Sequence, residues 1–151
     1  MGFAYAHHFA PDGARAALLR YRKEFRPSSS FRSKPHAIVA VAAVCGDTDA
    51  HADDLAGSSD LSWIRFGQGQ RDLPLPSLEE VRAYRYDDEE EQLRRLNRSR
   101  VIIGGVEKVS AVLRALVTES RADEVMATVT VHDHEERKRV YDRLVEAMRS
   151  G

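Results

Sequence analysis

The feature that most limits the fold of this chain is a threefold alternation of short apolar strand and amphipathic helix. The apolar segments span residues 3–6, 36–44 and 125–131, and each precedes a stretch with helical spacing of its apolar residues. Strands that alternate with helices in this way indicate parallel pairing and an α/β fold. Three strands are too few to close a (β/α)₈ barrel, which needs eight strands and roughly 250 residues. The pattern therefore predicts a portion of a larger architecture.

The composition is that of one globular domain, which we predict to span residues 1–151. Hydrophobic residues make up 42% of the chain and charged residues 31%, with a formal net charge of −1. This balance gives no general attraction to nucleic acid or to an anionic membrane. No apolar run reaches the roughly 18 residues that a membrane helix needs. A single cysteine, Cys45, cannot form an internal disulfide, so a reducing cytoplasm is the expected location.

A helical excursion is predicted between the second and third strands. A helix starts near Asp49 and continues through Phe66, and glycines and prolines then interrupt the pattern until residue 76. Ser77 and Glu80 form a capping box that predicts the start of a short helix. A charged helix follows over residues 87–95, and residues 101–105 lead into a further helix with one apolar face. Asp133 is the predicted N-cap of the last helix.

Several short motifs resemble the bacterial-luciferase-like, flavin-dependent monooxygenases, in particular the C-terminal portion of such a protein. Residues 3–6 and 8–12 are similar to the sixth barrel strand of that family and its following loop. The motifs in residues 21–28 and 43–50 resemble the segments before and after its seventh strand. Residues 122–126 match the entry to its eighth strand. Five residues fit the start of the closing helix, namely Asp133, His134, Arg137, Arg139 and Tyr141.

The resemblance implies a partial TIM (β/α)₈ barrel, roughly its last three βα units, with a helical excursion before the final strand. It also implies flavin-dependent oxygenation of a small-molecule substrate by O₂, with FMN as the expected flavin. The chain departs from the family at Gly104-Gly105-Val106-Glu107, where Gly-Ser-Pro-Glu is usual, and at His7, where serine is common. The equivalents of the first five strands are absent. We therefore expect a homo-oligomer or a partner that carries the N-terminal half of the barrel.

The expected site lies at the carboxyl ends of the strands, where barrel enzymes place their chemistry. His8 is the candidate catalytic residue, because an imidazole there could donate to a flavin oxygen or steer a proton. His7, Phe9 and His134 are candidate flavin contacts. Gly104 and Gly105 open a helix whose bare N–H groups could receive a phosphate. Arg98 and Arg100, just upstream, could supply counter-charge if the excursion folds over the site.

Two other functions remain open at this point. The chain could be a non-catalytic α/β interaction module that has lost the flavin site and pairs with itself or with a partner. Alternatively, His132 and His134 at the end of the third strand could hold a zinc ion in a metal-dependent hydrolase. The sequence shows no carboxylate or lysine partner for such a metal. We therefore assign no metal ligand.

Overall fold

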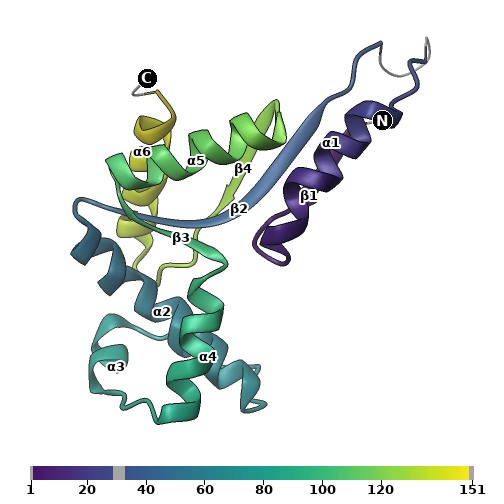
Figure 1. Cartoon of the computed structure of the whole chain (residues 1–151). Coiled ribbons are helices and arrows are strands. Elements are labelled where there is room, and N and C mark those ends of the chain that lie inside the picture. Colours follow the sequence, from purple (N-terminus) through teal and green to yellow (C-terminus); the bar gives the residue numbers. More distant parts are fainter. Residues whose placement is uncertain (1, 29–32, 150–151) are drawn as a thin grey trace.

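The computed structural model describes residues 2–28 and 33–149, which form a mixed α/β structure with a parallel sheet and six α-helices (Figure 1). In chain order the elements are β1 (Phe3–Ala6), the 3₁₀ turn η1 (Pro11–Gly13), α1 (Ala14–Glu24), β2 (Ala37–Gly46), α2 (Asp49–Gly67), α3 (Leu78–Ala83), α4 (Asp88–Arg98), β3 (Val101–Gly105), α5 (Val106–Ser120), β4 (Glu124–Thr128) and α6 (His134–Arg149). No helix in this described part is long and apolar enough to cross a membrane.

The sheet is organised around β2, which pairs in parallel with each of the other three strands. Ala40 is aligned with Ala6 of β1 and with Met126 of β4, whereas Ala42 is aligned with both β3 and β4. A strand has only two edges. One edge of β2 pairs with β4, and the other edge is shared by β1 and β3. The strand β1 lies beside the first half of β2, and β3 lies beside the second half. The sheet is therefore open.

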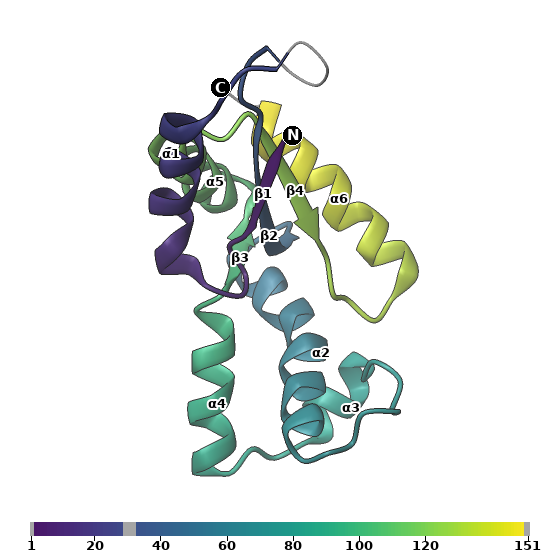
Figure 2. The same ribbon diagram turned by 90° about the vertical axis from the view of Figure 1, so that its right-hand side faces the viewer.

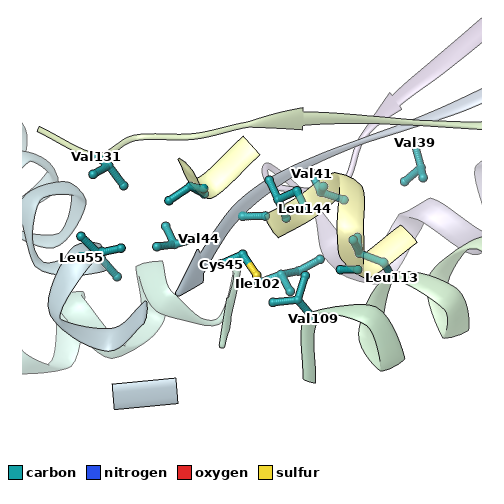
Figure 3. Close-up of a cluster of buried hydrophobic side chains, with 14 of the residues drawn as sticks. Val39, Val41, Val44, Cys45, Leu55, Ile102, Val109, Leu113, Val131 and Leu144 are labelled. Carbon is teal, nitrogen blue, oxygen red and sulfur yellow. The ribbon is translucent and has the colours of Figure 1, made fainter. Parts of the chain in front are cut away.

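One face of the sheet is covered by α1, α5 and α6, and this face contains the main core. Successive side chains of a strand point to opposite faces, and on β2 the fully buried set is Val39, Val41, Ala43 and Cys45. These residues pack with Val109 and Leu113 of α5 and with Val140 and Leu144 of α6 (Figure 3). Burial raises the pKa of the Cys45 thiol, which therefore stays protonated and inert at neutral pH.

The opposite face of the sheet is largely open and lined by small or apolar side chains. Ala40, Ala42 and Ile38 are half-buried there, and Met126 is 50% exposed. Exposed apolar surface of this kind commonly marks a contact with another chain or segment.

The helices α2, α3 and α4 form a separate group to one side of the sheet, as both views show (Figures 1 and 2). Leu55 and Ala56 of α2 join the core beside Val44. The capping box predicted at Ser77 is present, since Ser77 Oγ accepts from the Glu80 N–H at 3.2 Å and the Glu80 carboxylate accepts from the Ser77 N–H. The predicted helical excursion is thus confirmed.

The prediction of three strands was wrong, because the sheet formed by the described residues has four. The additional strand is β3, whose five residues pair with the last five residues of β2. The sequence indicated only a lead into α5 here, since a Gly-Gly pair usually breaks regular structure. The strand β2 extends past the end of β1, so an unpaired edge remains that β3 fills. The final strand is also shorter than predicted and ends at Thr128.

Asp123 joins three elements, and its titration should make the fold sensitive to acid. Its carboxylate accepts from Arg22 Nη2 of α1 at 2.5 Å and from the Ala37 N–H at 2.7 Å. These two bonds hold the pKa of Asp123 below its ordinary value of 3.8. A carboxyl group with a lowered folded-state pKa contributes stability that is present above the unfolded pKa and is lost as the pH falls below it.

We expect Asp123→Asn to flatten the acid side of the stability profile. Urea unfolding measured at a series of pH values from neutral to below 3.8 should show a smaller loss of stability in the variant than in the unchanged protein. Asp142→Asn, at an exposed position on α6, is the matched control and should retain the original profile. Parallel profiles for all three proteins would contradict this role of Asp123.

Candidate functional site

A cavity of about 230 Å³ lies at the carboxyl-terminal half of β2, beside the ends of β1 and β4 and against α2 and α4. The carboxyl ends of parallel strands are where α/β proteins bind their ligands. The lining residues are His8, Phe9, Ala42, Ala43, Val44, Ser59, Trp63, Asn97, Arg100, Val101, Thr128 and Thr130. The lining combines apolar walls with a few polar groups, which is the usual make-up of a small-molecule site.

His8 lines this cavity, and one hydrogen bond sets the tautomer of its neutral ring. Its Nδ1 lies 3.2 Å from the carbonyl oxygen of Ala40. Because a carbonyl oxygen only accepts, Nδ1 carries the proton, and the Nε2 of a neutral ring is left as an acceptor. The ring also packs against Phe9, with ring centroids 4.4 Å apart. Neutral His8 is therefore suited to accept a proton, and it can donate through Nε2 only when it is protonated.

Phe9 and His7 flank His8 on the segment that leaves β1. Phe9 is 67% exposed and lines the cavity. Nδ1 of His7 is buried and has no hydrogen-bond partner in the described part of the chain. Burial, followed by the neighbouring His8, lowers the pKa of His7, while Asp12 opposes this shift. His7 is therefore neutral at physiological pH, with one ring nitrogen still unpaired.

Gly104 and Gly105 lie apart from the His8 cavity. They end β3 at the N-terminus of α5, as the sequence suggested, but the Gly105 N–H donates to Asp49 Oδ1 at 2.7 Å. A second cavity of about 380 Å³ adjoins Gly105 and is lined mainly by residues of the β2–α2 turn and the first turn of α5. The predicted phosphate contact would have to displace a carboxylate, and it remains a prediction.

His134 and His132 also lie apart from His8, and each is already bonded to the protein. Arg137 Nη2 donates to His134 Nδ1 at 2.9 Å, and His132 Nδ1 donates to the carbonyl oxygen of Leu75 at 2.7 Å. The described residues contain no group of three or more His, Cys, Asp or Glu side chains that could hold a metal ion. Asp133 between them accepts from the Glu136 N–H at 2.7 Å, which confirms the predicted cap.

A buried ion-pair network fastens α4 to α2 behind the cavity wall. Asp60 is 4% exposed and accepts from Arg98 Nε at 2.7 Å, with Arg94 3.6 Å away. Arg98 also pairs with Asp53. Burial raises the pKa of Asp60, and the charge of Arg98 opposes that rise. The network fixes the position of the helix that carries Asn97 and leads to Arg100.

Most residues of the cavity wall were not predicted from the sequence to be part of a site. Trp63 and Ser59 come from α2, and Thr128 and Thr130 from the end of β4 and beyond. The threonines follow directly from the strand-end rule that selected His8, because they also end a strand. The position of Trp63 could not be found in this way, since it depends on how α2 folds back against the sheet.

No family model matches the chain. It is 36% identical over 146 residues to the uncharacterized protein YceB of Bacillus subtilis (strain 168), covering 97% of this chain and 44% of YceB. It is also 29% identical over 135 residues to a protein of Escherichia coli (strain K12) named luciferase-like monooxygenase, covering 89% of this chain and 40% of that protein. The chain thus spans less than half the length of these relatives.

The crystal structure of apo-MsnO8 superposes on this chain with a TM-score of 0.83 at 27% sequence identity. The match covers 97% of this chain and 44% of that one. Nearly the whole of this chain is thus similar to proteins named luciferase-like monooxygenase and to this solved structure.

Proposed function

We propose that this chain is the C-terminal part of a luciferase-like, flavin-dependent monooxygenase barrel, and that it contributes one wall of an FMN site. The observation that carries the proposal is the cavity at the strand ends, which combines His8 with two exposed aromatic side chains, Phe9 and Trp63. Reduced FMN, when bound, supplies the chemistry by which O₂ oxidises a small-molecule substrate. The relatives named luciferase-like monooxygenase support the same assignment.

The lining of the cavity fits part of a flavin. Trp63 and Phe9 offer aromatic surface to a planar ring, and Thr128, Thr130 and Asn97 offer hydroxyl and amide groups to its polar edge. The volume of about 230 Å³ is below the ~300–1,000 Å³ of most ligand pockets. The residues therefore fit the ring, and a further wall outside this lining is needed to complete the site.

Within the described residues β4 pairs only with β2, so its other edge and the open sheet face can bind the part that supplies this wall. An unpaired strand edge invites another strand to pair with it, and burial of Met126 and Ile38 would favour the contact. The partner is a second copy of this chain or a chain that carries the N-terminal half of the barrel. Light scattering on the purified protein distinguishes a self-associating chain from a monomer.

Binding of FMN to the purified chain tests the proposal. We expect micromolar binding in equilibrium dialysis, accompanied by a molar mass above that of a monomer. Trp63→Ala should weaken binding about tenfold, because stacking and apolar burial are both lost. Leu73→Ala is the control, since Leu73 is an exposed apolar residue that does not line the cavity. FMN binding that is absent from every assembly state would instead favour the non-catalytic interaction module.

A further inference from the structure

Four arginines occur between residues 94 and 100, and two of them, Arg94 and Arg98, are paired with carboxylates. Arg94 lies 3.1 Å from Glu91 and 3.6 Å from Asp60. Arg98 pairs with Asp60 at 2.7 Å and with Asp53. These carboxylates neutralise the charges of the two guanidinium groups, so neither arginine needs an anionic ligand.

Arg100 differs from these neighbours in both position and pairing. It is half-buried and lines the His8 cavity. Within residues 2–28 and 33–149, its side chain makes no hydrogen bond and no ion pair, although its backbone N–H donates to the Asn97 carbonyl oxygen at 3.1 Å. The cavity lining includes no Asp or Glu. Arg100 therefore brings an uncompensated positive charge to an otherwise mainly apolar cavity.

A partly desolvated guanidinium without a counter-ion attracts an anionic group. Here that group would bind in the cavity, beside the aromatic side chains. Arginine presents a planar fork of donors that matches the two oxygens of a carboxylate or a phosphate. The exposed rings of Phe9 and Trp63 line the same cavity. The cavity thus combines aromatic surface with one cationic group.

We propose that Arg100 is an anion-binding residue and that this cavity takes a planar aromatic ligand with a carboxylate or phosphate group. The inference rests on the proposed function, because it concerns the same cavity and specifies which ligand group binds at Arg100. The anion has two possible sources, the phosphate of FMN or a carboxylate on the substrate. Arg100 is held in place indirectly by the Arg98–Asp60 pair, which fixes the end of α4.

The test compares charged and neutral versions of each ligand. Anthranilate and its neutral amide, anthranilamide, probe the carboxylate, and FMN and riboflavin probe the phosphate. For at least one of the two pairs, the unchanged protein should bind the anion about tenfold more tightly than the neutral partner. Arg100→Gln should abolish that preference, and Arg100→Lys should retain part of it. Arg95→Gln, at an exposed position on the neighbouring helix α4, should leave the preference unchanged.

The results show whether the anion is the phosphate of FMN or a carboxylate of the substrate. They also test the inference and the proposed function separately. A preference for FMN over riboflavin that Arg100→Gln removes identifies the phosphate as the anion. An anthranilate preference that depends on Arg100, with equal binding of the two flavins, identifies a substrate carboxylate. The same anthranilate result with no flavin binding supports the inference and overturns the proposed function. Equal binding within both pairs, or a preference that survives Arg100→Gln, overturns the inference.

Discussion

Asp60→Ala is expected to destabilise the fold by about 3–5 kcal/mol, because it leaves a buried charge without its partner. Asp60 is 4% exposed and bonds to Arg98 at 2.7 Å. After the substitution, Arg98 loses its buried carboxylate partner and keeps only contacts with Asp53, namely the exposed carboxylate and the backbone carbonyl oxygen. The loss should appear as a lower urea midpoint, followed by circular dichroism, with an unchanged dependence of the unfolding free energy on urea concentration.

The control for this substitution is Asp54→Ala on the same helix. Asp54 pairs with Arg82 at 2.6 Å, but both side chains are exposed. Exposed pairs contribute about 0–1 kcal/mol, so this variant should unfold close to the original midpoint. Equal losses in the two variants would show that burial of Asp60 does not set the strength of its ion pair.

The parts of the fold that depend on short-range rules could be predicted from the sequence. The ten residues of β2 are nearly all apolar, a pattern that predicts a mostly buried strand. Most of these residues are indeed buried. The caps at Ser77 and Asp133 bond within three residues of themselves. Such features require only local chain geometry, and all of them are present.

Features that depend on distant segments could not be predicted. The strand β3 forms because β2 extends beyond β1 and offers a free edge. The sequence treated Arg98 and Arg100 as equivalent, but Asp60, 38 residues earlier, pairs with the first and not with the second. In the same way, Asp49 occupies the Gly105 N–H that the sequence assigned to a phosphate. These outcomes depend on how α2 packs against β3 and α4.

The last residue of β2, Gly46, is a position where only glycine fits, and its substitution is the second change with a large expected effect. A Cβ on Gly46 would overlap the backbone nitrogen of Ala52 and would lie 2.9 Å from both the Ala52 Cα and the Thr48 carbonyl oxygen. All of these atoms belong to the backbone, so no side-chain rotation relieves the overlap. The Ala52 N–H donates to the Thr48 carbonyl oxygen at 3.0 Å, so separating these atoms would break the first turn of α2.

Gly46→Ala is therefore expected to destabilise the protein by about 3 kcal/mol, the upper part of the usual range for overpacking. Gly67→Ala is the matched control, because a Cβ there meets no atom within 4 Å. Gly67 is the last residue of α2, and alanine favours helix more than glycine does. The control should therefore match or slightly exceed the original stability in the same urea experiment. If both variants unfolded at the original midpoint, the β2–α2 turn would have room to move, and the close contact at Gly46 would not constrain the end of the strand beside the cavity.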